Sequence, residues 1–244
     1  MKLLAFDTST DHISIAVTRP VDGVAQVWQH SGAGGAQASS SLIPAIEALM
    51  AQAGLRYDAL DAIAFGQGPG SFTGLRTACA VAQGLAFGAG IPVLPVDTLL
   101  MVAEQARFEH FNAATKCRVL ALLDARMDEL YAAHYEFDKG SWAQTGEHQL
   151  LHPEALTLGN SQALAGNVFA AYGERLPQAP PLSPELPRYA VLPSATAMLR
   201  LAPALLAAGH AVAPARALPR YIRDKVAKTT LERVAEKATV IPVR

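Results

Sequence analysis

Apolar and polar positions near the start of the chain alternate in a pattern that predicts a β-hairpin. The run Leu3–Phe6 predicts a short buried strand, and Ile13, Ile15 and Val17 fall on one side of a second strand. The turn between these strands carries one carboxylate and three hydroxyl groups, those of Asp7, Thr8, Ser9 and Thr10.

A similar pattern returns near the middle of the chain. The apolar run Leu120–Leu123 ends at Asp124, a polar turn follows, and a new alternating stretch begins at Leu130. Apolar runs that end in Asp are common in α/β proteins, so the recurrence alone fits chance as well as duplication. If it is a duplication, two related α/β units face each other across a cleft, with Asp7 and Asp124 pointing inward.

Helices and strands alternate in the remaining segments. Helices are predicted at 41–52, 72–87 and 195–208, and strands at 62–65 and 91–96. The proline-rich segment 177–193 fits neither a regular helix nor a central strand. These features divide the chain into an N-terminal lobe of residues 1–98, to which 210–226 return, a C-terminal lobe of residues 99–209, and a tail of residues 227–244.

Composition limits the function classes open to the chain. Of its 244 residues, 51% are hydrophobic and 17% are charged, as in well-packed globular α/β proteins. The formal net charge of −1 provides no general positive field for nucleic acid, so any binding to RNA would depend mainly on the charge of a partner. The first residues form neither a signal-peptide core nor a membrane span, and Cys79 and Cys117 lack metal-ligand spacing. Together these features predict a cytoplasmic protein.

The segment Phe65–Arg76 combines a strand end, a glycine-rich turn and a helix start. Its sequence, FGQGPGSFTGLR, lacks the Gly-Lys-Ser/Thr of a Walker loop and has Ser71 where the third glycine of GxGxxG would stand. Free N–H groups at the helix N-terminus would suit an anion. Glycine would equally permit close packing of the helix on the strand. The spacing alone supports both interpretations.

The helix that follows carries small residues on two stripes, Gly74, Ala78, Ala82 and Ala86 on one, and Ala80, Gly84 and Gly88 on the other. Small residues four apart let another backbone approach closely. One stripe would pack on its own sheet, and we expect the outward stripe to contact another subunit. The residues assigned to this interface are Leu42, Ile46, Gly74, Arg76, Ala78 and Ala82. Arg76 is expected to pair with an acid or a carbonyl of the turn or of the partner.

The histidines and acids provide few arrangements suited to catalysis. His148 and His152 have the spacing of a helical metal pair, but Pro153 and the apolar neighbours predict a strand. In a strand the two residues stand about 13 Å apart, so we expect no metal site. Asp7 and Asp124 could hold magnesium-bound water across a nucleotide cleft, or each could cap its own turn.

Four segments together resemble the TsaB (YeaZ) family over nearly the whole chain, from Met1 to about Val226. They are LAFDTST at 4–10, FGQGPGSFTGLR at 65–76, DARMDELY at 124–131 and PRYIR at 219–223. The resemblance implies an α/β fold of the actin-like ATPase (ASKHA) type, with two duplicated lobes that each open with a β-hairpin. A vestigial nucleotide cleft would then be lined by Asp7, Thr8, Ser9, Thr10 and Asp124.

The same resemblance implies a non-catalytic subunit in the threonylcarbamoylation of tRNA adenosine. Such a subunit pairs with a TsaD-like catalytic subunit, and a TsaE-like ATPase joins them. It meets tRNA through the complex, forms a homodimer when alone, and does not bind membranes.

The TsaD family holds its catalytic metal with an HxxxH helix, and those two histidines align with Thr98 and Val102 here. Neither side chain is a metal ligand as imidazole is. The resemblance therefore implies no catalytic residue, no metal and no required cofactor in this chain. Weak ATP or ADP binding at the complex interface is left open.

Another interpretation also stays open. A small-molecule kinase or ATP-binding protein of the same fold would use Asp7 and Asp124 around magnesium and ATP. Ser9 argues against it, because such kinases usually have glycine at that position so that the phosphates can approach.

Overall fold

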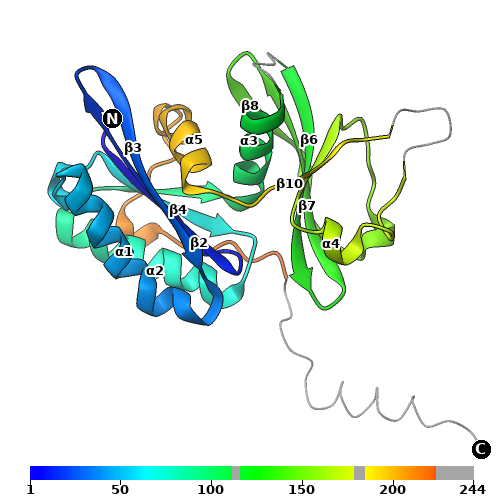
Figure 1. The fold of residues 1–244 in the computed structure, drawn as a ribbon, viewed down its shortest axis with the longest axis horizontal. Helices are drawn as coiled ribbons and strands as arrows, with labels where there is room; N and C mark the ends of the chain where they lie inside the picture. Colours follow the sequence, from blue (N-terminus) through cyan, green and yellow to red (C-terminus); the bar gives the residue numbers. More distant parts are fainter. Residues whose placement is uncertain (112–115, 179–184, 224–244) are drawn as a thin grey trace, which may run out of the picture.

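The chain forms two five-stranded sheets that stand side by side, with helices between and outside them (Figure 1). The structure, a computed structural model, describes residues 1–111, 116–178 and 185–223. The first sheet has the strand order β3-β2-β1-β4-β5, with β1 at Leu3–Asp7, β2 at His12–Val21, β3 at Val24–Ala33, β4 at Ala62–Gly68 and β5 at Val93–Asp97. The second has the order β10-β9-β6-β7-β8, with β6 at Lys116–Arg126, β7 at Glu129–Asp138, β8 at Ser141–Leu151, β9 at Ala163–Gly166 and β10 at Arg188–Ala190.

The two sheets share one topology. In the first, β1 pairs antiparallel with β2, and β2 pairs antiparallel with β3. On its other side β1 pairs parallel with β4, which pairs parallel with β5. Strands β6 to β10 repeat these pairings in the same order. The recurrence in the sequence is therefore a structural duplication, and the predicted α/β fold with two actin-like lobes, each opening with a β-hairpin, is confirmed.

Helices cover the sheets in layers. α1 (Ala38–Ala53) and α2 (Phe72–Ala89) cover the outer face of the first sheet. α3 (Thr98–His110) packs between the two sheets, and α5 (Ala195–Ala207) lies beside it on the inner face of the first sheet. The short helix α4 (Phe169–Tyr172) covers the far face of the second sheet. Within the described ranges, no helix is long and apolar enough to cross a membrane.

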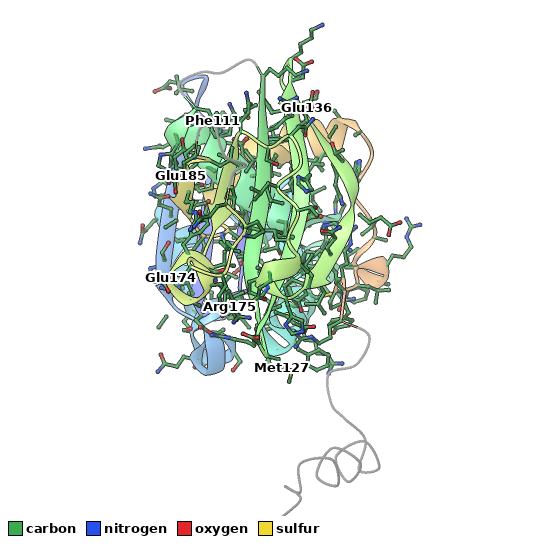
Figure 2. The ribbon with its side chains drawn as sticks, turned by 90° about the vertical axis from the view of Figure 1, so that its right-hand side faces the viewer. Phe111, Met127, Glu136, Glu174, Arg175 and Glu185 are labelled. Atoms are coloured by element: carbon green, nitrogen blue, oxygen red, sulfur yellow. The ribbon has the colours of Figure 1, made fainter. Side chains whose placement is uncertain are left out.

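The pattern of β1 explains this layering. Leu4 and Phe6 point toward α1 and α2, whereas Leu3 and Ala5 point toward α3 and α5. A strand covered on both faces is apolar at consecutive positions, and β1 is apolar until it reaches Asp7. Both hairpins end at the same side of the molecule, and Figure 2 shows Met127 at the tip of the second one, far from Glu136 near the opposite end of β7.

The structure differs from the sequence prediction in several elements, and α3, β9, α4 and β10 were not predicted. β3 was not predicted, because nearly all its residues are exposed and its sequence lacks the alternation of a half-buried strand. α5 was assigned to the C-terminal lobe of residues 99–209, but it packs through Met198 and Leu201 on the first sheet. The inner face of that sheet carries small residues such as Ala5 and Ala64, which leave room for a helix. The predicted tail, 227–244, lies outside the described residues.

The stripe of α2 that was expected to face a second subunit is buried in the first lobe. Ala78 and Ala82 are 0% exposed and pack with Leu42 and Ile46 of α1 in the core, while Gly74 is buried at the hairpin turn. The small residues Gly74, Ala78 and Ala82 let α2 approach its own sheet closely. These residues offer no surface to a second subunit, which corrects their assignment. The exposed stripe of α2 consists of Phe72, Arg76, Ala80, Gly84 and Gly88.

This orientation of α2 predicts opposite outcomes for two large substitutions. Ala82→Trp should lower the free energy of unfolding by about 1–3 kcal/mol or more, because the indole has no space between α2 and the sheet. Ala80→Trp, on the exposed stripe, should change it by less than about 0.5 kcal/mol. Urea denaturation followed by circular dichroism measures both values. Equal stability of the two variants would contradict the orientation of α2.

Candidate functional site

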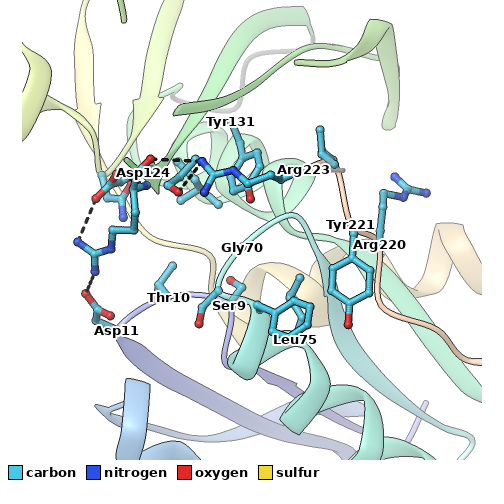
Figure 3. A pocket seen from close by; sticks show the side chains of 17 residues that line it. Ser9, Thr10, Asp11, Gly70, Leu75, Asp124, Tyr131, Arg220, Tyr221 and Arg223 are labelled. Atoms are coloured by element: carbon cyan, nitrogen blue, oxygen red, sulfur yellow. Dashed lines mark hydrogen bonds and ion pairs between the residues drawn. The ribbon is translucent and has the colours of Figure 1, made fainter. Parts of the chain in front are cut away.

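The two hairpin turns face each other across a cavity of about 240 Å³ between the lobes (Figure 3). Its lining comes mainly from four segments, the first turn at 9–11, the glycine-rich turn and start of α2 within 70–75, the second turn at 123–126, and the C-terminal residues 220–223. Of the residues predicted for the cleft, Ser9, Thr10 and Asp124 line this cavity. Asp7 and Thr8 are buried behind it, each 1% exposed.

Asp7 ends β1 and braces the first turn. Its Oδ1 accepts hydrogen bonds from N and Oγ of Ser9 at 3.0 and 2.7 Å. Its Oδ2 has no hydrogen-bond partner among the described residues. Burial raises the pKa of Asp7 to about 6, and the two bonds from Ser9 oppose this shift without cancelling it. A carboxyl group so deeply buried cannot hold metal-bound water in the cavity, so Asp7 fits the role of a turn brace.

The glycine-rich turn packs its backbone against the first hairpin turn. A Cβ atom on Gly70 would lie 2.6 Å from Ser9 O, and one on Gly74 would lie 1.8 Å from Thr8 O. Ser71 N donates a hydrogen bond to Ser9 O at 2.7 Å. Thr8 Oγ1 donates to Gly74 O at 2.7 Å. The first hairpin turn thus occupies the space beside the N-terminus of α2, and of the two interpretations of this segment the geometry supports close packing.

Asp124 is bonded into the second hairpin turn. Its Oδ1 accepts hydrogen bonds from Arg126 N at 2.8 Å and from Tyr172 OH at 3.0 Å. Its N donates to Asn167 Oδ1 at 2.9 Å. Asp124 therefore caps its own turn, as one of the two sequence interpretations proposed.

The second turn has a strained backbone. Arg126, Met127 and Asp128 follow one another with positive φ angles of 61°, 55° and 64°. This left-handed region costs a residue other than glycine about 1 kcal/mol or more. Contacts from outside the turn must offset that cost. One of them is Arg175 Nη2, which donates to Asp128 Oδ2 at 2.9 Å.

An ion pair joins the two turns directly. The guanidinium group of Arg126 bonds Asp11 of the first turn, and its Nη1 bonds Asp124 Oδ2 at 3.1 Å. It thus lies between one carboxylate from each lobe (Figure 3). The Arg126 and Asp11 side chains are 65% and 69% exposed, so the pair adds no more than about 1 kcal/mol to stability. It is a direct side-chain contact between the two turns.

Residues 213–223, the C-terminal strap, cross the cleft from the first lobe to the second. Arg220 N donates to Gln67 O at 2.8 Å, and its Nη1 bonds Asp97 Oδ2 at 3.1 Å. Three residues later, Arg223 Nη2 bonds Glu129 Oε2 at 2.6 Å and two carbonyl groups of the second turn. The strap therefore fastens the first lobe to the strained turn of the second.

These contacts decide what the cavity can do chemically. Arg126, Arg220 and Arg223 all line it, and each bonds a carboxylate of the chain itself. Ligand pockets usually measure about 300 to 1,000 Å³, and this cavity measures about 240 Å³. Phosphoryl transfer needs acids that are free to hold Mg²⁺ near the phosphates. The arrangement suits a clamp between two lobes better than a phosphoryl-transfer site.

The two positions that align with the TsaD metal ligands have a packing role. Thr98 and Val102 lie in α3 and are 0% exposed. Thr98 Oγ1 accepts a hydrogen bond from Gly68 N at 3.1 Å, which braces the glycine-rich turn.

His148 and His152 belong to different hydrogen-bond networks. β8 runs to Leu151, as the sequence predicted, and His148 Nε2 lies 2.5 Å from Asp97 Oδ2. His152 Nδ1 donates to Asp128 O at 2.8 Å. In residues 1–111, 116–178 and 185–223, no three His, Cys, Asp or Glu side chains are grouped as metal ligands would be.

The residues that close the cleft were not predicted from the sequence. Neither Asp11 and Arg126 nor the strap arginines were assigned to it. The available signal was the opposite charge of Asp11 and Arg126 in two turns that were expected to face each other. For Arg76, Nε donates to Tyr221 OH at 2.9 Å, and within the described residues no acid or carbonyl of the turn accepts a hydrogen bond from it. Pairing with an acid or carbonyl of a partner stays a prediction.

Comparison with known proteins agrees with this structure. The family model that matches residues 33–241 is TsaD, tRNA N6-adenosine threonylcarbamoyltransferase. The tRNA threonylcarbamoyladenosine biosynthesis protein TsaB of Escherichia coli K12 is 35% identical and covers 93% of this chain and 96% of its own length. The TsaB of Haemophilus influenzae is 33% identical over 93% of this chain and 95% of its own. The solved structure of YeaZ from Pseudomonas aeruginosa has a TM-score of 0.79 at 37% identity, over 91% of this chain and 99% of that one.

The two duplicated lobes and the family model together define a member of the TsaD class of actin-like proteins. Within that class, the full-length relatives and the YeaZ structure are more specific. The chain belongs to the TsaB (YeaZ) family.

The raised pKa of Asp7 predicts a pH-dependent effect of Asp7→Asn. The folded chain binds the Asp7 proton more tightly than the unfolded chain does, because the pKa of Asp7 is about 6 in the folded chain and 3.8 in the unfolded one. This contribution to stability is complete below pH 4 and is lost as the pH rises through about 6. Asp7→Asn should therefore raise the free energy of unfolding above pH 7 by up to about 3 kcal/mol, with little gain near pH 4.

Urea denaturation of both proteins at the two pH values measures this difference. Asp58→Asn is the control, because Asp58 is exposed beside Arg56 and its pKa is lowered, which gives the opposite sign. The same gain at both pH values for Asp7→Asn would show that Asp7 is not a buried acid of raised pKa.

Proposed function

We propose that this chain is a non-catalytic partner subunit in the biosynthesis of threonylcarbamoyladenosine in tRNA. It pairs with a TsaD-like catalytic subunit, a TsaE-like ATPase joins the pair, and tRNA is bound through the complex in the cytoplasm. Two proteins that are 35% and 33% identical to it are named for this biosynthesis. The matching family model, that of a threonylcarbamoyltransferase, supports the same substrate class.

The observation that carries the non-catalytic role is the closure of the cleft by groups of the chain itself. Asp7 is buried, Asp124 caps its turn, and Arg126 connects the two turns. MgATP could enter this cavity only by breaking the contacts of Arg126 and of the strap. This argues against the small-molecule kinase. The chain requires no cofactor of its own, and any weak ATP or ADP site belongs to the interface with the partner.

A hydrolytic role has less support. One P. aeruginosa structure, 36% identical to this chain, is described as similar to the peptidase YeaZ. The metal ligands of the TsaD family correspond here to Thr98 and Val102, and both side chains are buried. Their chemistry supports a partner role and offers nothing to activate water.

The partner subunit packs on the exposed stripe of α2 in this proposal. Glycine in a helix costs about 0.5–1 kcal/mol relative to alanine, so two helical glycines need a reason. A Cβ atom on Gly84 or Gly88 would meet no atom within 4 Å, so nothing in the chain's own lobe requires glycine there. Close approach of a helix from a second subunit would explain both. The free chain would use the same stripe to form a homodimer.

Ala80→Trp tests this interface. The indole should block close helix contact, so pairing with the TsaD-like subunit and tRNA modification by the reconstituted complex should both be lost. The free chain should become monomeric by light scattering, with its fold intact. Ala204→Trp, on the exposed side of α5, is the matched control. Normal pairing and modification with Ala80→Trp would place the interface elsewhere.

Asp124→Asn tests the absence of phosphoryl transfer in this chain. An amide keeps the oxygen that caps the turn, so the reconstituted complex should modify tRNA within about twofold of the wild-type rate. Complex formation is measured in the same preparation. Loss of modification with normal complex formation would show that Asp124 takes part in chemistry.

A further inference from the structure

Three side chains form a surface cluster where α2 begins and the strap passes over it. This Arg76 patch consists of Phe72, Arg76 and Tyr221. The Arg76 guanidinium lies 3.8 Å above the Phe72 ring centre, and its Nε donates to Tyr221 OH at 2.9 Å. The ring centres of Phe72 and Tyr221 lie 5.3 Å apart. Phe72 and Tyr221 are 39% and 45% exposed, so the cluster is held by mutual contact and is still open to solvent.

The charge of Arg76 is not neutralised within the described part of the chain. No carboxylate there lies within 4.0 Å of its guanidinium group. Arg126, Arg220 and Arg223, which line the adjacent cavity, each have such a partner. A cation held against an aromatic ring, without a counterion, attracts an acidic group from outside.

The patch continues the exposed stripe of α2. Phe72, Arg76, Ala80, Gly84 and Gly88 follow at intervals of four residues, and all five are exposed. Residues four apart form one ridge on a helix. A partner helix that packs on the small residues at one end of this ridge would therefore reach Arg76 at the other end.

We propose that the Arg76 patch is a docking site for a carboxylate side chain of the protein subunit that packs on α2. This rests on the proposed function, which supplies that subunit. Tyrosine, phenylalanine and arginine are the residues that protein interfaces favour at their centre. Single-stranded RNA, the other class of occupant, needs a track of free cations for its phosphates, and the neighbouring arginines are already neutralised.

The docking site depends on contacts at the cleft, because the strap that carries Tyr221 is bonded to both lobes there. Tyr221 lies between Arg220, which bonds Asp97 of the first lobe, and Arg223, which bonds Glu129 of the second. The Arg223 side chain is 14% exposed and points into the molecule, so a partner cannot contact it directly. Arg223 is a positioning residue, because it holds Tyr221 beside Arg76 while the strap spans both lobes.

The test is titration of the full-length chain with the TsaD-like subunit of the same organism. Arg76→Ala and Tyr221→Ala should each weaken binding by about tenfold or more. Arg76→Ala should also reduce the loss of affinity that added salt causes, since one ion pair is removed. Lys116→Ala is the control, because Lys116 is an exposed cation paired with Glu136 in the second lobe, away from α2. Circular dichroism verifies that each variant is folded.

Arg223→Ala separates positioning from contact. It should weaken binding of the wild-type chain severalfold but have no further effect in the Tyr221→Ala background. Independent effects of the two substitutions would refute the role of the strap.

The outcomes also separate this proposal from the proposed function. Wild-type binding that Arg76→Ala and Tyr221→Ala leave unchanged would overturn the docking site alone. Variants that bind the TsaD-like subunit normally but lose affinity of the complex for tRNA would overturn it in favour of RNA. A wild-type chain that does not bind the TsaD-like subunit would overturn both proposals.

Discussion

Backbone contact between the glycine-rich turn and the first hairpin turn determines how the parts around the cleft are placed. Gly70 and Gly74 lie so close to the hairpin that a methyl group at either would collide with its carbonyl oxygens. This contact fixes where α2 begins, and therefore which side of α2 meets the sheet. Gly68 is close to the strap in the same way, since a Cβ atom there would lie 2.6 Å from Arg220 O. The strap can cross at this point because the turn beneath it has no side chain.

The second lobe has no such glycine-rich support at its turn, and it uses charged side chains instead. The strained residues Arg126, Met127 and Asp128 are held by bonds from three arginines that come from different parts of the chain. Arg175 bonds Asp128, Arg126 itself bonds acids of both lobes, and Arg223 bonds the turn carbonyls. Backbone strain is kept only where surrounding contacts over-determine it. Two of the arginines that stabilise this turn, Arg126 and Arg223, also line the cleft.

The sequence was sufficient to predict the two-lobed architecture, but not to predict the exposed strand β3 or which side of α2 is exposed. Both hairpins could be predicted because an alternating strand on each side of an Asp turn is a local pattern, and it recurs. β3 could not, because a strand exposed over most of its length shows no alternation. The orientation of α2 was ambiguous, since Ala78 and Ala82 on one side and Ala80 and Gly84 on the other look alike as small residues. Their burial depends on the sheet, which lies far away in sequence.

The candidate site was predictable only in part for a similar reason. Asp7 and Asp124 were identified from their local turns, but whether each binds a metal or caps a turn depends on neighbours from other segments. Asp11 meets Arg126 across the cleft, and Arg223 meets Glu129, through separations of 115 and 94 residues. The pattern of apolar and polar residues contains no information about such distant contacts. The opposite charges in turns expected to face each other were the available signal.

Closure of the cleft and construction of the exposed surface use the same segment of chain. The strap that brings Arg223 to the second turn also brings Tyr221 to Arg76. A nucleotide that displaced the strap would therefore remove an aromatic ring from the surface beside α2, and a subunit bound at that surface would resist the displacement. By linkage, each event weakens the other by the same free energy. A closed cleft is thus a condition for a stable docking surface. This gives a physical reason why a partner subunit of this fold would keep two lobes and leave little room for a ligand between them.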